Sequence, residues 1–441
     1  MEEYYLSVRL IDDRCKGCVN CIKRCPTEAI RIRGGKARIT ESRCIDCGEC
    51  IRNCSSHAKS AITDSLADLE NYKYNIALPA PTLYAQFGLE FSIEAILAGL
   101  LKLGFDEVHE VALGAEIVSL AIRDYLQQAD IKRPAISSAC PAVVRLIQVK
   151  FPELIEHLVP INPPVEVAAR LARTEYARKH AVDPAEVGTW FITPCPAKMT
   201  AVKQPLGSKT SHISGAIAIS QIYGDLLRVL SQGDNNIDCQ RASRLGIGWA
   251  VAGGETDSVE QANTLVVHDI ANVSGVLEQV TMGKLNDIDY IETLACAGGC
   301  IGGPLTVENR FVAEHRMKQR LQKLEAEYAA LGKMPLQGYH PCELGVAERR
   351  NIEPRPIMCL DEDIFKAMYK VEIMEKTLEN LPGLDCGSCG SPNCMALAED
   401  IAQESASETD CVFKLRERVR DLAKEMINLA EKLPPSLEKE P

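Results

Sequence analysis

The chain has 441 residues, of which 46% are apolar and 25% charged, and its formal net charge is −12. This length and composition predict a globular protein of several domains, and the acidic balance argues against nucleic-acid binding. The longest apolar run, residues 96–103, is too short to span a membrane and contains Lys102. Residues 1–5 lack the basic start and apolar centre of a signal peptide, so we expect a cytoplasmic protein.

Cysteine is the most informative residue type in this chain. Of the 19 cysteines, sixteen fall into four groups of four. Tight C-x-x-C spacing in a protein expected in a reducing compartment favours metal ligation over disulfides. Cys239, Cys342 and Cys359 match no group, and we expect them to be buried apolar thiols.

The first two groups repeat one spacing near the N-terminus. Each run reads C-x-x-C-x-x-C-x-x-x-C, the two-cluster ferredoxin pattern, in which the fourth cysteine of each run ligates the other cluster. Zinc is the alternative, but zinc needs four ligands for each ion and would not explain this crossed repeat. We therefore predict a domain with two 4Fe–4S clusters over residues 1–65. The predicted ligand sets are Cys15, Cys18, Cys21 and Cys54 for one cluster, and Cys44, Cys47, Cys50 and Cys25 for the other.

Residues 66–370 alternate helix-like and strand-like stretches. The apolar residues of 93–101 fall on one helical face, residues 108–113 read as a strand, and short apolar stretches at 190–192 and 290–291 each run into a cysteine loop. Cysteine loops that follow strands fit an α/β fold, in which ligands gather beyond the carboxyl ends of the strands. We predict an α/β domain with mixed or parallel sheets flanked by helices. Beside it we expect a small α+β ferredoxin domain and a small helical Fe–S module.

Three loops of this middle region carry the third cysteine group. They read SSACPA at 137–142, TPCPAK at 193–198 and ETLACAGGC at 292–300. One such cysteine alone would often be a buried structural thiol. Four cysteines on three loops behind a ferredoxin-like domain predict a single shared iron–sulfur centre.

The three loops together resemble the signature loops of the FeFe hydrogenases, and the resemblance extends over the chain up to about residue 360. It implies an H-cluster, in which a 4Fe–4S cube is joined through one cysteine to a two-iron unit that carries carbon monoxide, cyanide and a bridging dithiolate. It also implies that Cys300 joins the two parts and that Lys198 donates a hydrogen bond to a cyanide. The implied cube ligands are Cys140, Cys195, Cys296 and Cys300, and the implied cofactor-lining residues are Ala80, Pro81, Ser138, Pro194, Gly298 and Gly299, the two glycines because they let the backbone pass close to the cofactor.

The chain departs from the fast members of that family along the expected proton path. In those members a second cysteine directly precedes the one that matches Cys140 and takes up the proton, whereas Ala139 stands here and cannot carry one. The matching stretch of the preceding helix, 117–127, has Asp124 as its only carboxylate. Changes around a cofactor tune it without removing it. The pattern resembles the sensory members, so we predict slow, reversible oxidation of H₂.

The fourth cysteine group lies near the C-terminus with the spacing C-x₂-C-x₄-C-x₁₆-C. It resembles the single-cluster module of corrinoid iron–sulfur proteins and of Rnf-type electron-transfer subunits, and zinc is again the alternative. We predict a third accessory 4Fe–4S cluster in a module over residues 371–411, which would act as a second electron port. Its ligands would be Cys386, Cys389, Cys394 and Cys411.

Residues 412–441 are predicted to form a heptad helix and a tail. The apolar spacing alternates between three and four residues, and two prolines follow it. Such a stripe favours a parallel homodimer or the docking of an output partner, and the alternative is packing on its own domain. Because Cys411 directly precedes the stripe, a change in cluster charge could act on the start of the helix. The stripe is Val412, Leu415, Val419, Leu422, Met426, Leu429 and Leu433.

The sequence thus predicts a low-turnover hydrogen and redox sensor from an anaerobe. It would exchange H₂ for protons and electrons, and pass the electrons through 4Fe–4S clusters to a redox partner or output enzyme on a separate chain. One rival is a fully catalytic hydrogenase that uses Asp124 or ordered water for proton exit. The other is a non-enzymatic electron-transfer protein without the two-iron unit, against which the retention of Lys198 and all four cube ligands argues.

Overall fold

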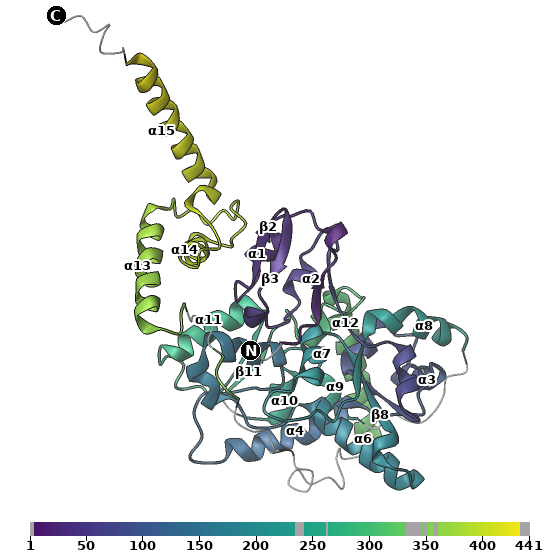
Figure 1. Ribbon diagram of the computed structural model, residues 1–441. Helices are drawn as coiled ribbons and strands as arrows, with labels where there is room; N and C mark the ends of the chain where they lie inside the picture. Colours follow the sequence, from purple (N-terminus) through teal and green to yellow (C-terminus); the bar gives the residue numbers. More distant parts are fainter. Residues whose placement is uncertain are drawn as a thin grey trace, which may run out of the picture. The chain divides into compact units, whose positions relative to one another are not determined.

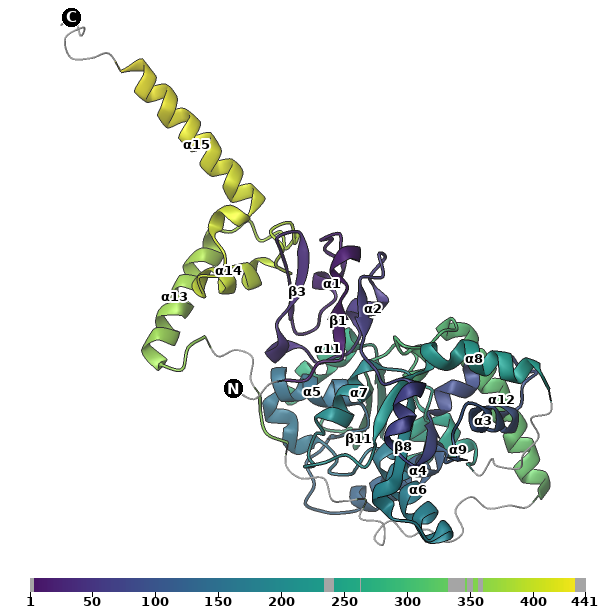
Figure 2. The same cartoon turned by 45° about the vertical axis from the view of Figure 1, so that its right-hand side comes forward.

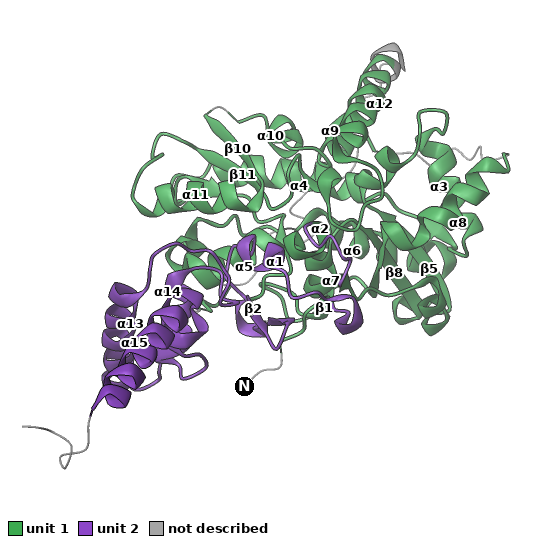
Figure 3. Ribbon diagram, turned by 90° about the horizontal axis from the view of Figure 1, so that it is seen from above, with its two compact units in different colours: residues 1–9, 44–52, 59–356 green, residues 10–43, 53–58, 357–441 purple. Residues whose placement is uncertain are grey.

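The structure is a computed structural model that describes residues 4–233, 242–261, 263–331, 346, 352–355 and 360–432. The chain forms two compact units (Figure 3). Unit 1 consists of residues 1–9, 44–52 and 59–356, and unit 2 of residues 10–43, 53–58 and 357–441. The predicted division into four domains stays a prediction. Cys239, Cys342, Cys359 and Leu433 lie outside the described residues.

Unit 1 is built around two parallel sheets (Figure 1). The larger has the order β6-β5-β8-β9, and the smaller has the order β10-β11-β7. Parallel sheets need both faces covered, and β8 is buried along its whole length. The strands are β5 (Tyr74–Pro79), β6 (Glu107–Val108), β7 (Ala135–Ile136), β8 (Val187–Thr193), β9 (Gly215–Ala218), β10 (Thr264–His268) and β11 (Tyr290–Leu294), and a separate pair is β1 (Val8–Leu10) with β4 (Lys59–Ala61).

Helices cover both faces of the larger sheet (Figures 1 and 2). Successive strand residues point to opposite faces. Ala77 therefore packs with α3 and α8, whereas Ile76 and Leu78 pack with α6 on the other side. The α/β fold class predicted from the sequence is confirmed. The helices of unit 1 are α2 (Glu49–Arg52), α3 (Ile93–Lys102), α4 (Val111–Leu126), α5 (Pro141–Lys150), α6 (Pro164–His180), α7 (Pro196–Lys203), α8 (Ile219–Ser231), α9 (Arg244–Gly248), α10 (Gly254–Val259), α11 (Ile270–Thr281) and α12 (Arg310–Leu331).

The strand predicted at residues 108–113 is wrong. Strand β6 ends at Val108, and Val111 already begins the helix α4. The first nine residues of α4 are all buried, so the helix shows little alternation between apolar and polar residues there. A short apolar run of this kind does not by itself distinguish a buried helix from a strand.

Unit 2 combines the first part of the ferredoxin-like repeat with the C-terminal segment. Its strands β2 (Ile30–Arg33) and β3 (Lys36–Ile39) form an antiparallel hairpin. Gly34 and Gly35 connect them with positive φ angles of 56° and 71°, as a tight hairpin turn requires. The helices of unit 2 are α1 (Asn20–Lys23), α13 (Ile364–Asn380), α14 (Cys394–Ala402) and α15 (Val412–Glu431). In the part of the chain that the structure describes, no helix has the length and apolarity needed to cross a membrane.

Candidate functional site

Three strands of unit 1 end at the three cysteine loops. Strand β7 leads to Cys140, β8 leads to Cys195, and β11 leads to Cys296. Cys140 and Cys195 are also the N-cap residues of α5 and α7, and a proline occupies the first turn of each helix, where its missing N–H is tolerated. Two of the loops therefore present a thiol at a helix N-terminus, where the helix dipole favours negative charge.

The structure brings the four predicted cube ligands to one cavity of about 90 Å³. Several other residues implied by the family resemblance line the same cavity: Ala80, Pro81, Ala139, Pro194 and Lys198. Three do not line it: Ser138, Gly298 and Gly299. At Gly299, with φ 95°, an added Cβ would lie 2.6 Å from the backbone nitrogen of Ala252, so this glycine permits close packing of two chain segments.

Burial and mutual repulsion disfavour the charged form of the cavity thiols. Burial raises the pKa of Cys300 to about 12 and that of Cys296 to about 11, and neighbouring thiolates raise both further. The pKa of Cys195 is raised well above its ordinary value, again mainly by burial. A polynuclear cation binds thiolates and would offset this repulsion, so the donor set fits an iron–sulfur cube.

Two polar groups in the cavity also fit a cofactor with anionic ligands. The Thr82 side chain is fully buried and lines the cavity, and its hydroxyl has no hydrogen-bond partner among the described residues. A buried hydroxyl without a partner is unfavourable, so a bound acceptor would satisfy it. Lys198 lines the cavity as well, and its Nζ donates to the carbonyl oxygen of Ala139 at 2.8 Å.

Sequence reasoning missed a pair of buried carboxyl groups in the cavity wall. Glu255 and Glu292 both line the cavity and are 2% and 1% exposed. Burial raises the pKa of Glu255 to about 8, with a further contribution from Glu292. Burial also raises the pKa of Glu292. At neutral pH the pair can therefore hold a proton beside the four cysteines.

Hydrogen bonds connect Glu255 to Ala139 through Ser137. The hydroxyl of Ser137 donates to Glu255 at 2.9 Å and accepts the backbone N–H of Ala139 at 3.4 Å. The hydroxyl of Tyr290 also donates to Glu255. A carboxyl group thus lies two hydrogen bonds from Ala139.

Glu292 extends the carboxyl pair toward half-buried residues. It accepts hydrogen bonds from the backbone N–H of Gly253 at 2.9 Å and from the hydroxyl of Thr256 at 2.7 Å. Thr256 is only half-buried, and the next residue, Asp257, is exposed. Glu292 could have been suspected from the sequence, because it is the first residue of the ETLACAGGC loop. The sequence around Glu255 contains no comparable motif.

The carboxylate named from the sequence as a proton exit is not part of the site. Asp124 is exposed. Among the described residues, it lines neither the cysteine cavity nor a larger cavity that shares Lys198 with it. Glu116 lies one residue before the stretch 117–127 and is buried on α4. Burial is the main cause of its raised pKa. Glu116 accepts the N–H of Ser243 at 2.6 Å and does not line the cavity, so its visible role is structural.

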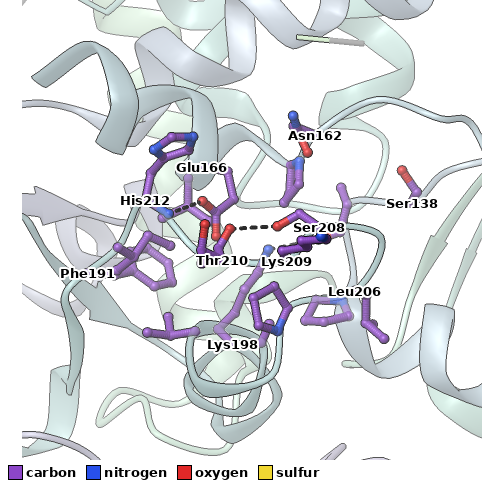
Figure 4. A pocket seen from close by; sticks show the side chains of 18 residues that line it. Ser138, Asn162, Glu166, Phe191, Lys198, Leu206, Ser208, Lys209, Thr210 and His212 are labelled. Atoms are coloured by element: carbon purple, nitrogen blue, oxygen red, sulfur yellow. Dashed lines mark hydrogen bonds between the residues drawn. The ribbon is translucent and has the colours of Figure 1, made fainter. Parts of the chain in front are cut away.

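A larger polar cavity of about 410 Å³ adjoins the first one (Figure 4). Lys198 and Ala139 line both cavities. Around the larger cavity, Glu166 accepts the N–H of His212 at 2.8 Å, and Lys209 lies on the same exposed segment as His212 (Figure 4). Lys198 is therefore placed between the cysteine cavity and this larger cavity.

Part of the ferredoxin-like repeat also reaches the cysteine cavity. Cys47, a predicted ligand of an N-terminal cluster, lines the cavity, and Arg52 of α2 donates to the carbonyl oxygen of Gly302. Burial by itself lowers the pKa of Arg52, but Cys296, Glu49 and Cys47 together outweigh it, so the net pKa is raised. The Arg52 guanidinium thus lies near two predicted cluster ligands, Cys296 and Cys47.

The remaining predicted ligands lie in both units. Among the residues of unit 2, the four C-terminal cysteines line one small cavity of about 10 Å³. Within the described ranges, no three His, Cys, Asp or Glu side chains are arranged to hold a single metal ion. A site for a single ion differs from a cube, because in a cube each thiolate binds a different iron. The predicted crossed ligation by Cys25, which lies in unit 2, with Cys44, Cys47 and Cys50 of unit 1 stays a prediction.

Comparison with known protein families gives three matches along the chain. Residues 73–222 and 226–304, more than half of the chain, match the C-terminal domain of the iron-only hydrogenase large subunit. Residues 7–55 match a 4Fe–4S dicluster domain, and residues 381–413 match an Fe–S cluster module. Two of the predicted cluster regions therefore match known iron–sulfur modules.

Individual relatives are distant. The chain is 25% identical to the periplasmic [Fe] hydrogenase large subunit of Nitratidesulfovibrio vulgaris over 67% of this chain and 85% of that protein. It is 23% identical to iron hydrogenase 1 of Clostridium pasteurianum, of which it spans 50%, and 22% identical to human nuclear prelamin A recognition factor, of which it spans 70%. Among solved structures, an FeFe-hydrogenase variant from Chlamydomonas reinhardtii is similar, with a TM-score of 0.48 and 14% identity, over 66% of this chain and 98% of the other.

Proposed function

Because the chain belongs to the iron-only hydrogenase family, also called the FeFe hydrogenases, we propose that it binds H₂ at the cysteine cavity and oxidises it slowly and reversibly. The family resemblance predicted from the three loops is confirmed, and iron–sulfur cofactors are supported by the matched domains. The sensory role, the low turnover, the H-cluster and the number of clusters are part of the proposal. The observation that carries it is the convergence of Cys140, Cys195, Cys296 and Cys300 on one cavity.

The residues of the cavity have distinct roles in this proposal. The four cysteines would hold the cube, and Cys300 would also bind the two-iron unit, which would supply a metal that polarises H₂ and a base for its proton. Lys198 and the free hydroxyl of Thr82 donate hydrogen bonds to the anionic ligands of that unit. Ala80 and Pro81 exclude water from one side of the cavity.

Glu255 is the proposed first protein acceptor of the proton. Its raised pKa lets it exchange a proton near neutral pH, and Ser137 and Tyr290 hold its carboxyl group in place. Glu292 is the proposed next acceptor, because it lies between Glu255 and half-buried Thr256. The proposed path uses Glu255 and Glu292 in place of Asp124.

We expect slow turnover because the cavity wall nearest the cysteines lacks a proton acceptor at position 139. Ala139 provides no proton acceptor there, so the proton must pass to a carboxyl group held by its own hydrogen bonds. A slow enzyme with several redox clusters suits a sensor of hydrogen or redox state. Its partners would be H₂, protons and a redox or output protein on another chain. The clustered cysteines suit a reducing cytoplasm of an anaerobe.

An infrared spectrum of anaerobically maturated protein tests the proposal. We expect bands from bound carbon monoxide and cyanide, which no amino acid produces, together with slow reduction of an artificial acceptor under H₂. Bands without any H₂-dependent change would contradict the reaction. Absence of the bands in protein with complete 4Fe–4S clusters would favour the non-enzymatic electron-transfer protein, and turnover as fast as that of the catalytic family members would contradict the sensory role.

We also propose that α15 pairs with α15 of a second copy. No residue of α15 is buried, and its heptad residues are exposed: Leu415 is 45%, Val419 57% and Leu422 42% exposed. Valine and leucine alternating at the two core positions favour a two-stranded parallel coiled coil. The charged opposite face would stay in water.

We expect Leu422→Asp to convert this dimer to a monomer, because a carboxylate at the core of a short coiled coil is left desolvated without a partner. Light scattering coupled to size-exclusion chromatography measures the mass. Lys424→Asp on the outer face is the matched control and should leave the mass unchanged. A monomeric unsubstituted protein, or a Leu422→Asp variant that remains dimeric, would contradict the proposal.

A further inference from the structure

Within unit 2, the C-terminal cysteine loop packs against the N-terminal cluster segment. Gly387 lies between two predicted ligands of the C-terminal cluster. An added Cβ there would lie 3.4 Å from Lys23 Cε, 3.5 Å from Ile22 Cδ1 and 3.6 Å from Val19 Cγ1. Those three residues lie between the predicted ligands Cys18 and Cys25. The two segments that carry cluster ligands thus approach so closely that a side chain at Gly387 would touch the N-terminal segment.

Lys23 fixes this contact by binding the opposite loop. Its Nζ donates to the carbonyl oxygen of Asp385, and to that of Pro392 at 2.8 Å. The two carbonyl groups flank the stretch that contains Cys386 and Cys389. One ammonium group from the N-terminal segment therefore ties both ends of the C-terminal ligand loop.

The β2–β3 hairpin makes a second, backbone-level contact with the same loop. The N–H of Ile32 donates to the carbonyl oxygen of Gly390 at 2.7 Å. Gly390 has a φ of 83°, and an added Cβ would clash with the carbonyl oxygen of Ile32. The close approach therefore requires glycine at this position.

Ion pairs close the contact on the side of α14. Asp400 accepts from Arg31 at 2.7 Å and from Arg33 at 2.6 Å, and Glu399 accepts from Arg43 at 3.0 Å. The side chains of Arg31 and both carboxylates are only 11–12% exposed. Charge-assisted hydrogen bonds with so little exposure are stronger and less screened than surface pairs. The C-terminal module is thus held firmly against the hairpin.

We propose that this contact is an electron-transfer junction between the cluster at Cys15, Cys18, Cys21 and Cys54 and the cluster at Cys386, Cys389, Cys394 and Cys411. One electron passes at a time, so the N-terminal cluster is oxidised by one unit as the C-terminal cluster is reduced by one. Tunnelling rates fall steeply with distance, and contact between the ligand loops keeps that distance short. The C-terminal cluster is therefore in series with the N-terminal one.

The junction would connect electron transfer to the helix α15. Cys411, a predicted ligand of the receiving cluster, is buried and is the N-cap residue of α15. An electron that arrives through the junction changes the charge next to the start of that helix. The inference needs both clusters, but it does not need the hydrogen chemistry of the proposed function.

Electron paramagnetic resonance of the full chain tests the junction. Protein produced without the two-iron unit is reduced chemically, so a failure of the H₂ reaction cannot affect the result. We expect the signal of the reduced C-terminal cluster to be split or broadened by magnetic interaction with the N-terminal cluster across the junction. In Gly390→Ala, we expect that interaction to be lost while the iron and sulfide content is retained.

Two matched comparisons separate loss of contact from loss of the cluster. Gly383→Ala carries a similar backbone strain, with φ 65°, but an added Cβ there meets nothing within 4 Å, so the interaction should persist. Glu399→Arg should weaken the interaction, and adding Arg43→Glu should restore it. Independent signals from two fully occupied clusters in the unsubstituted protein, an interaction unchanged in both Gly390→Ala and Glu399→Arg, or zinc in the C-terminal site would each overturn the proposal.

Discussion

Replacement of Cys300 by serine is expected to abolish H₂ oxidation. Cys300 is the one cavity cysteine that would bind both the cube and the two-iron unit, and a hydroxyl group is a much poorer ligand for iron than a thiolate. The loss should exceed the 10-fold to about 100-fold effects that follow from changes around a metal site. The measurement is H₂-dependent dye reduction together with the infrared bands of carbon monoxide and cyanide.

The accessory clusters provide the internal control for this substitution. Their paramagnetic signals should be unchanged in Cys300→Ser, because their predicted ligands lie outside the three loops. Cys239→Ser, at a cysteine that belongs to no ligand set, should keep both the activity and the bands. A Cys300→Ser protein that still shows the bands and oxidises H₂ at the original rate would refute the assignment.

Replacement of Glu255 by glutamine is expected to slow H₂ oxidation by about 10²-fold to 10⁴-fold, the range typical of a lost acid–base group. Glutamine keeps the size and the hydrogen bond from Ser137 but cannot take up a proton. The infrared bands should remain, because no cube ligand is changed. Glu116→Gln is the matched control, since it neutralises another buried carboxyl group with a raised pKa that does not line the cavity.

The pH dependence gives this prediction a sign. Glu255 has a pKa raised to about 8, so it is protonated below that value and can accept a proton only above it. If Glu255 limits the rate, H₂ oxidation should rise as the pH approaches about 8 and then level off, whereas H₂ evolution should fall over the same range. Glu255→Gln should lose this inflection, and Glu116→Gln should keep it. The same inflection in Glu255→Gln would rule out Glu255 as the limiting group.

Stability should respond to pH in the same window. The folded protein keeps the Glu255 proton between the ordinary value of 4.5 and about 8, so the folded state binds more protons than the unfolded state there. The free energy of unfolding contributed by this group therefore decreases as the pH rises through that window. Thermal unfolding of Glu255→Gln should show a weaker decrease than the unsubstituted protein.

The cluster ligands and the heptad helix were predicted from the spacing of residues that are close in the sequence. Ligands two or three residues apart are brought together by a single turn of the backbone, so the ferredoxin-like runs could be recognised without a fold, and the dicluster match covers residues 7–55. The heptad stripe from Val412 was equally local, and α15 follows it as far as Glu431. By contrast, residues 108–113 misled, because an apolar run has the same appearance in a buried helix and in a strand.

Residue type and short-range spacing were enough to indicate iron–sulfur chemistry, because cluster ligation depends on both, and the three loops are specific enough to indicate the family. The side chains that surround the cysteines could be identified only from the folded chain. Glu255 and Glu292 are 37 positions apart and meet because β11 and α10 bring them to one cavity wall, where burial raises their pKa values. Likewise, Asp124 falls on the exposed side of α4. Burial and long-range contact are properties of the folded chain, so the proton path could be proposed only once the fold was known.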